Sequence, residues 1–178
     1  MVIGSHVPRT TRQVEMALAE TGICGIEVNV RALLEDRHRA QEIARAAGRA
    51  NQLLREGVDA LIYTSRDLVT AAQVGGIGED LRVGQSVSQG LIDIVDLVSE
   101  RPRYLLAKGG ITSSDLATRA LHVKRAWVLG QILPGVPVWR LGGESRYPDL
   151  PYIVFPGNVG DGSALVSVVE MLSPASRE

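Results

Sequence analysis

The sequence is poor in the residues that build disulfides and metal sites. It has a single cysteine, Cys24, and three histidines. One cysteine cannot form an intrachain disulfide, which fits a reducing compartment, and Cys24 is expected to be a small core residue in an apolar run. His6, His38 and His122 are scattered along the chain, and no acidic or cysteine cluster accompanies them. The pattern therefore gives no metal site of the zinc type.

A charge excess and a long apolar run are also missing. The formal net charge is -1, so there is no electrostatic reason to expect nucleic acid or an anionic membrane as a partner. No apolar run is long enough to span a bilayer, and no signal-peptide pattern stands at the start. We therefore expect a cytoplasmic protein. Its 178 residues suffice for one domain with a full hydrophobic core.

Three common catalytic or binding motifs are absent. The sequence contains no G-x-x-x-x-G-K-[ST] loop, no complete G-x-G-x-x-G after an apolar run, and no G-x-S-x-G turn. These absences argue against a P-loop enzyme, a standard dinucleotide-binding fold and a hydrolase with a nucleophile elbow.

What the sequence does contain is a regular alternation of short apolar runs with longer segments of helical periodicity. Most of the runs are continuously apolar, which is typical of strands covered on both faces. The runs are Met1–Ile3, Ile23–Val30, Val58–Tyr63, Tyr104–Ala107, Ala126–Leu129, Val136–Leu141 and Tyr152–Phe155. The helical segments are Thr10–Thr21, Arg31–Glu56, Gly78–Glu100, Thr112–Leu121 and Gly162–Leu172.

This order predicts a single α/β domain with a largely parallel sheet and helices on both faces. The last two runs have no helix between them, so the sheet is expected to be mixed at one edge. The segment Arg31–Glu56 is expected to be the longest helix, with Glu35 and Arg39 paired on its solvent face. Residues 1–172 form the domain, and residues 173–178 are expected to fray.

Three glycine-containing segments follow predicted strands and precede predicted helices. They are Gly4–Pro8, Ala107–Asp115 and Phe155–Gly162. In an open α/β sheet such segments lie at the carboxyl ends of the strands, where backbone N–H groups and helix dipoles attract phosphate. Each segment alone slightly favours a structural turn between strand and helix over a phosphate site. Three at one sheet edge make a shared anionic ligand about as favoured as three turns.

Two charged residues within the second segment have alternative interpretations. Lys108 could neutralise phosphate, but a lysine at a strand end is more often simply exposed. Asp115 is either a Mg²⁺ contact through water or an acid in the first turn of a helix, where it complements the helix dipole.

Four stretches in order make the sequence similar to the C-terminal nucleotide-binding domain of the four-carbon acid sugar kinase family. They are Gly4–Pro8 with Thr10 and Thr11, Lys108–Asp115, Gly130–Pro137 and Phe155–Gly160. The resemblance implies ATP- and Mg²⁺-dependent phosphorylation of small sugar acids such as tetronates or their oxo derivatives. The segment Leu133–Pro137 looks like a rigid turn that shapes the site.

The resemblance also implies which residues contact the nucleotide. The first-loop serine corresponds to Ser5, and the Gly-Gly-x-Thr turn that approaches the phosphates corresponds to Gly109, Gly110 and Thr112. The loop that closes over the nucleotide corresponds to Gly157, Asn158 and Gly160. No catalytic residue is assigned to this chain.

The sequence departs from the family pattern in two respects. The family often has an acidic residue inside the Gly-Gly-x-Thr turn, where this sequence has Ile111, so the metal contact is not assigned and Asp115 is the substitute considered. The family enzyme also has a preceding domain that binds the sugar acid and supplies the catalytic base. We expect that domain to act in cis or in trans, and the present chain to bind ATP or ADP without turnover.

Two other interpretations are retained. The chain could be a non-catalytic module that senses nucleotide or scaffolds a partner, or an unrelated enzyme with a phosphate ligand on the same sheet architecture. An exposed apolar face where a second domain would dock favours the kinase, and a polar or occluded site favours the stand-alone module. A homo-oligomer is compatible with all three.

Overall fold

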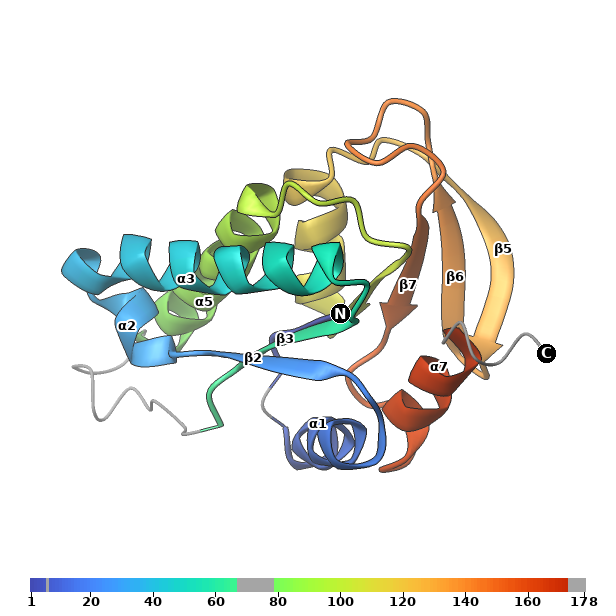
Figure 1. The fold of residues 1–178 in the computed structure, drawn as a ribbon, viewed down its shortest axis with the longest axis horizontal. Helices are drawn as coiled ribbons and strands as arrows, with labels where there is room; N and C mark the ends of the chain where they lie inside the picture. The colour runs from blue at the N-terminus through green and yellow to red at the C-terminus, as the bar shows by residue number, and fades with distance from the viewer. Residues whose placement is uncertain (6, 67–78, 173–178) are drawn as a thin grey trace.

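The structure is a computed structural model that describes residues 1–5, 7–66 and 79–172. In this part of the chain seven strands form one sheet (Figure 1). The strands are β1 (Val2–Ile3), β2 (Cys24–Val28), β3 (Ala60–Thr64), β4 (Leu105–Lys108), β5 (Ala126–Leu133), β6 (Val136–Leu141) and β7 (Pro151–Phe155). The helices are α1 (Pro8–Glu20), α2 (Val30–Leu34), α3 (Asp36–Arg55), α5 (Glu79–Leu97), α6 (Gly110–Asp115), the π-helical turn η1 (Leu116–Ala120) and α7 (Ala164–Leu172).

The sheet has the predicted mixed character. Its strand order is β2-β3-β1-β4-β7-β6-β5. The pairs from β2 to β7 are parallel, whereas β6 pairs antiparallel with both β7 and β5. Each predicted strand is present, and the missing helix between β6 and β7 accounts for the antiparallel edge, because a short connection can only reverse the chain direction.

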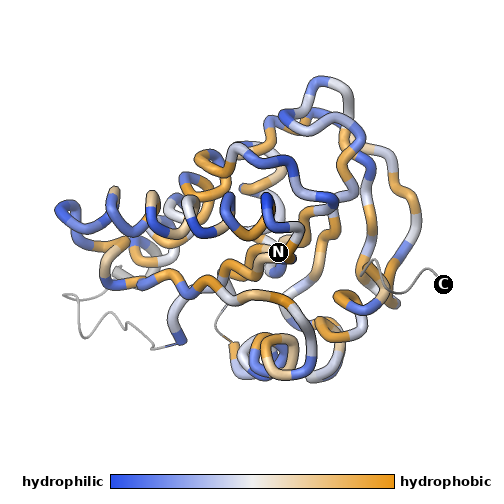
Figure 2. Tube along the Cα trace, in the orientation of Figure 1, coloured by the Kyte–Doolittle hydropathy of each residue, from blue (hydrophilic) through white to orange (hydrophobic). Residues whose placement is uncertain are grey.

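Helices cover both faces of the sheet. Helices α3 and α5 with η1 pack on one face, and α1 and α7 pack on the other (Figure 1). Neighbouring residues of a strand contribute to opposite layers: Val2 joins the α3–α5 core, and Ile3 joins the α1–α7 core. This alternation explains why the strands read as continuous apolar runs, which Figure 2 shows as orange segments in the middle of the fold.

The prediction of one continuous helix over Arg31–Glu56 is wrong, because the segment forms two helices. The backbone at Glu35 is extended, with φ -101° and ψ 113°, and separates α2 from α3. The break lets Leu33 pack against α5, where a methyl group on Gly90 would lie 2.7 Å from the Leu33 Cδ1 atom. Packing against a distant helix therefore overrides the local helical periodicity.

The expected pair between Glu35 and Arg39 does not form either. Arg39 instead donates to Asp93 on α5, with Nη2 and Oδ2 3.0 Å apart, and to the carbonyl of Leu33. Glu35 pairs with His38, 2.7 Å from its carboxylate. The long guanidinium reaches a partner that is fifty-four residues away, which helical spacing alone does not reveal.

Strand β5 is one of the two edge strands of the sheet and is more exposed than the other edge strand, β2. Trp127, Val128 and Leu129 are 48%, 71% and 57% exposed. The strand also runs four residues beyond the predicted end at Leu129. Cys24, expected in the core, is only partly buried. None of the described helices is long and apolar enough to cross a membrane.

Several residues of the sequence-based interpretation lie outside the described part of the chain. They are His6 in the first glycine loop, Gly78 at the start of the third helical segment, and residues 173–178.

The core of the fold predicts how two strand substitutions will differ. Leu106 in β4 is fully buried, so Leu106→Ala removes packed methyl groups and is expected to lower the free energy of unfolding by about 2–5 kcal/mol. Val128→Ala in the exposed edge strand is expected to change it by less than about 0.5 kcal/mol. Urea denaturation monitored by circular dichroism measures both, and equal losses would contradict the assignment of the core.

Candidate functional site

The carboxyl ends of three adjacent strands meet at one side of the sheet. Strand β4 pairs in parallel with β1 on one side and with β7 on the other. The three glycine segments leave these strands, and a cavity of about 1320 Å³ opens where they converge. Of the seven nucleotide contacts implied by the sequence, five line this cavity. These five are Ser5, Gly109, Gly110, Thr112 and Gly157.

The three loops lie in van der Waals reach of one another, and at Gly4 the approach leaves no room for a larger residue. A methyl group on Gly4 would lie 2.7 Å from the Thr112 hydroxyl oxygen, and one on Gly109 would lie 3.8 Å from the Cβ of Ser5. A methyl group on Gly157 would lie 4.0 Å from the Cα of Gly109. Glycine is therefore required at Gly4 to bring the first two loops together.

Gly109 has a conformation that other residues avoid. Its φ is 110°, and it is the residue from which α6 begins. The turn is held from below by Ser113, whose hydroxyl donates to the carbonyls of Ala107 and Gly109 at 2.8 and 2.7 Å. The hydroxyl of Tyr152, on β7, donates in turn to the Ser113 carbonyl at 2.7 Å. The Gly-Gly-x-Thr turn is therefore fixed by hydrogen bonds beneath the cavity.

Asn158 and Gly160 occupy the same loop as Gly157 but do not line the cavity. Gly160 has φ 78°, and a methyl group there would overlap the Cβ of Ala164 at the start of α7. Its glycine is thus explained by backbone conformation and packing. The predicted rigid turn before β6 lies close to this loop, since a methyl group on Gly135 would lie 3.7 Å from the Val159 methyl groups.

Lys108 is not exposed, contrary to the sequence-based expectation. Its side chain is fully buried, and its ammonium group donates to the carbonyls of Pro156 and Gly157 at 3.0 and 3.4 Å. The nitrogen also lies 4.0 Å from the centre of the Phe155 ring. Burial, and to a smaller degree the charge of Arg9, lowers the pKa of the Lys108 ammonium to about 8.

The described fold and loops agree with a known family. The model of the nucleotide-binding C-terminal domain matches residues 1–165 of the chain. The chain belongs to this family. The match confirms the resemblance to the nucleotide-binding domain of four-carbon acid sugar kinases that the ordered motifs predict. None of the curated proteins compared with the chain matches it.

Solved structures share the fold of this nucleotide-binding domain. One is a Bordetella bronchiseptica protein with a domain of unknown function (DUF1537), crystallised with bound citrate as a domain-swapped dimer. It is 20% identical, has a TM-score of 0.73, and the match covers 95% of this chain and 39% of that one. Haemophilus influenzae protein HI1011, of the same DUF1537 family, is 17% identical with a TM-score of 0.64, and the match covers 97% and 40%. The chain thus spans about two fifths of their length.

The backbone of Ser5, in the first glycine segment, is held by Arg66, a residue that the sequence did not single out. Arg66, just after β3, donates from Nη1 to the carbonyl of Ser5 at 2.6 Å. Its Nε and Nη2 atoms are buried and have no acceptor among the described residues. Burial lowers the pKa of this guanidinium, and nothing in the local sequence marks the arginine as a neighbour of the loop.

A second wall of the cavity is a network of charged and polar side chains. It links α3, α5, α6 and η1 through Arg39, Asp93, Gln89, Arg119, Asp115 and Ser88, all of which line the cavity. Asp115 accepts a hydrogen bond from the Ser88 hydroxyl at 2.5 Å and lies 3.9 Å from Arg119, both through Oδ2. It is the last residue of α6, so its interpretation as a first-turn acid is wrong.

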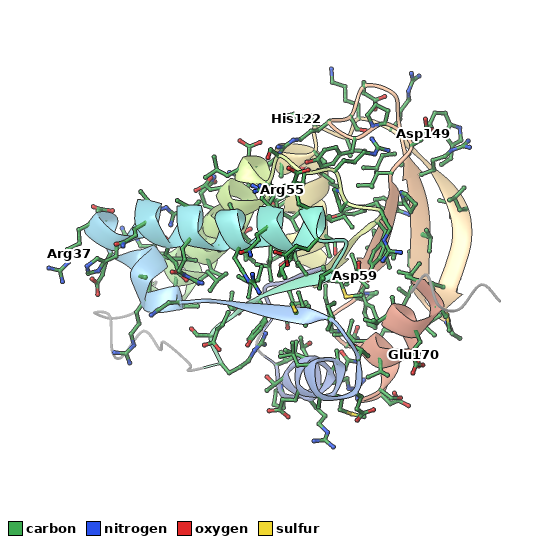
Figure 3. The ribbon with its side chains drawn as sticks, viewed as in Figure 1. Arg37, Arg55, Asp59, His122, Asp149 and Glu170 are labelled. Carbon is green, nitrogen blue, oxygen red and sulfur yellow. The ribbon has the colours of Figure 1, made fainter. Side chains whose placement is uncertain are left out.

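Metal-binding clusters are absent from the described part of the chain. No group of three or more His, Cys, Asp or Glu side chains there could hold an ion. Figure 3 shows His122 far from Arg37, and the partner of His38 is Glu35, so the side chains give no histidine cluster among the described residues. Among the described residues, fewer than three such side chains could therefore contact a divalent ion at this cavity, and the ligand and water would have to supply the other contacts.

The buried Lys108 predicts a particular pH dependence of stability. Between about pH 8 and about pH 10.5 the unfolded chain keeps a proton on this amine that the folded chain has released. The free energy of unfolding contributed by Lys108 therefore rises with pH across this window. Urea denaturation at about pH 7.5 and about pH 10 should show the unaltered protein gaining stability relative to Lys108→Met. Parallel pH profiles for the two proteins would contradict the lowered pKa.

Proposed function

We propose that the chain is the ATP-binding domain of a cytoplasmic kinase that phosphorylates small four-carbon sugar acids, tetronates or oxo-tetronates. The observation that carries the proposal is the convergence of Ser5, the Gly109–Thr112 turn and Gly157 on one cavity at the carboxyl ends of β1, β4 and β7. Glycine backbones and small hydroxyls at strand ends suit the phosphates of a nucleotide, because they offer N–H and O–H donors without steric obstruction.

The size of the cavity is consistent with this proposal. Small-molecule sites commonly have volumes of about 300–1000 Å³. At about 1320 Å³ the cavity exceeds this range, so it has room for a nucleotide and for part of a phosphoryl acceptor. Phosphoryl transfer needs the two side by side and in line.

Mg²⁺ is proposed as the accompanying ion, with Asp115 as its protein contact. Asp115 lines the cavity, and among the described residues its Oδ1 takes part in no hydrogen bond or ion pair. In nucleotide sites one or two carboxylates together with phosphates and water hold this ion. When bound, it would neutralise charge on the phosphates. The apolar Ile111 stands where the family often has an acid, so Asp115 is the nearest described substitute.

The acceptor and the catalytic base are proposed to come from the remainder of a longer protein or from a partner chain. The chain spans 39% and 40% of the solved proteins that share its fold. Two apolar side chains at the cavity, Val7 and Ile111, are 44% and 75% exposed. This exposure favours a covering substrate domain over the alternative, a non-catalytic nucleotide-sensing or scaffolding module.

The first test is direct titration of the chain with ATP and Mg²⁺ by isothermal calorimetry. We expect measurable binding, together with negligible phosphorylation of tetronates by the chain alone, because positioning of both substrates supplies most of the catalysis. Lack of any nucleotide affinity would contradict the proposed function. Robust turnover by the chain alone would contradict the assignment of the base and acceptor site to another domain.

A matched pair of glycine variants tests the location of the site. Gly109→Ala and Gly57→Ala both place a side chain at positive φ, 110° and 73°, so each is expected to lose stability, by about 1–3 kcal/mol. Gly109 lines the cavity, whereas Gly57 follows α3 with nothing within 4 Å of the added methyl. Only Gly109→Ala is expected to weaken ATP binding, by about tenfold. Equal dissociation constants in the two variants would place the nucleotide elsewhere.

A further inference from the structure

The loop after β7 is held through its carbonyl groups by side chains from two other elements. Lys108 on β4 donates to the carbonyls of Pro156 and Gly157. On α1, Thr10 donates to Gly157 at 3.4 Å, Arg9 to Asn158 at 2.5 Å, and Gln13 to Val159 and Asp161 at 3.2 and 2.6 Å. Every carbonyl from Pro156 to Val159, and that of Asp161, thus has a side-chain donor.

This arrangement fixes where the amide groups of the loop point. The C=O and N–H of a trans peptide unit point in opposite directions, and no cis peptide occurs among the described residues. Since the carbonyls of Pro156, Gly157 and Val159 face Lys108 and α1, the N–H groups of Gly157, Asn158 and Gly160 face away from those side chains.

At Gly157 the opposite side of the loop faces the cavity. Gly157 lines the cavity, but Lys108, Thr10 and Gln13 do not, and all three are fully buried beneath the loop. Among the described residues the N–H groups of Gly157, Asn158 and Gly160 have no hydrogen-bond acceptor. The N–H of Val159, which lies between them, donates to the carbonyl of Pro156. Neighbouring backbone donors left free in a loop of this kind form a site for an anion.

We propose that Gln13 and Lys108, assisted by Thr10, are positioning residues that turn the amides of the loop Gly157–Gly160 toward the phosphates of the nucleotide. This inference rests on the proposed function. It also gives Asn158 and Gly160 a role through their backbones, although neither residue lines the cavity.

Gln13 is the most informative of the three residues. Its Nε2 bonds two carbonyls of the loop, whereas its Oε1 is buried without a donor among the described residues. An unpaired buried oxygen is costly, and a leucine of similar volume would avoid that cost. Packing alone therefore does not explain a glutamine at this position. The hydrogen bonds from its Nε2 to the two loop carbonyls do.

The test compares Gln13→Leu with Tyr147→Phe in the full chain. Tyr147→Phe also removes a buried hydrogen bond to a carbonyl, that of Val98, but lies outside the cavity and the loop. Calorimetry should show ATP binding weakened about tenfold by Gln13→Leu and less than about twofold by Tyr147→Phe. Thr10→Val, which keeps the side-chain shape, should weaken it about threefold and serves if Gln13→Leu does not fold.

Backbone NMR provides a second readout that a loss of stability would not produce. With ATP added, the amide resonances of Gly157, Asn158 and Gly160 should shift in the unaltered protein and respond much less in Gln13→Leu. ATP binding by the unaltered chain with equal affinity in Gln13→Leu and Thr10→Val would overturn this inference while leaving the proposed function intact. Failure of the unaltered chain to bind ATP would instead contradict the proposed function itself.

Discussion

The parallel pairing of β4 between β1 and β7 is the constraint on which the site depends. In this register Ala107 lies opposite Val2 on one side and Val154 on the other. The three strands therefore end together, and the loops that leave them meet although they are separated by about a hundred and fifty residues of chain. Glycine at position 4 follows from this convergence, since a larger side chain there would push the first two loops apart, whereas Gly109 is required by its positive φ. Burial of both sheet faces by helices makes the register robust, because a slip by one residue would exchange the Val2 and Ile3 cores.

The strands could be predicted because strands that are buried on both faces consist of consecutive apolar residues. The antiparallel edge could also be predicted, from the absence of a helix between β6 and β7. The three site loops could also be predicted from local signals, because each consists of the end of a strand, a glycine and the start of a helix. The family motifs then separated Ser5, Gly109 and Gly157 from glycines that only form turns, such as Gly57. For these residues, local pattern and tertiary position agree.

The rest could not be predicted because its physical cause lies far away in the sequence. From the sequence alone, Lys108 is expected to be an exposed lysine at a strand end. In the structure its ammonium group contacts the Phe155 ring of β7 and the carbonyls of Pro156 and Gly157 in the loop that follows. The helical periodicity of α1 does not single out Gln13, whose amide donates to two carbonyls of the same loop. The polar groups of long side chains can form hydrogen bonds with water or with a distant part of the backbone, and local periodicity does not distinguish the two cases. The break at Glu35 has the same origin, since Leu33 turns toward a glycine on α5.

The hydrogen bonds beneath the loops have an energetic consequence for binding. An anion site made of backbone amides is effective only when those amides are already oriented, because ordering several residues at the moment of binding would cost about 1–2 kcal/mol for each. In this domain folding has already met that cost: Ser113 and Tyr152 fix the Gly109 turn, and Lys108 and Gln13 fix the loop after β7. The wall across the cavity is likewise held by mutual contacts, from Arg39 to Asp115. Under the proposed function, a phosphoryl donor would meet a rigid surface here, and the movement that brings donor and acceptor into line would come from the proposed substrate domain over Val7 and Ile111.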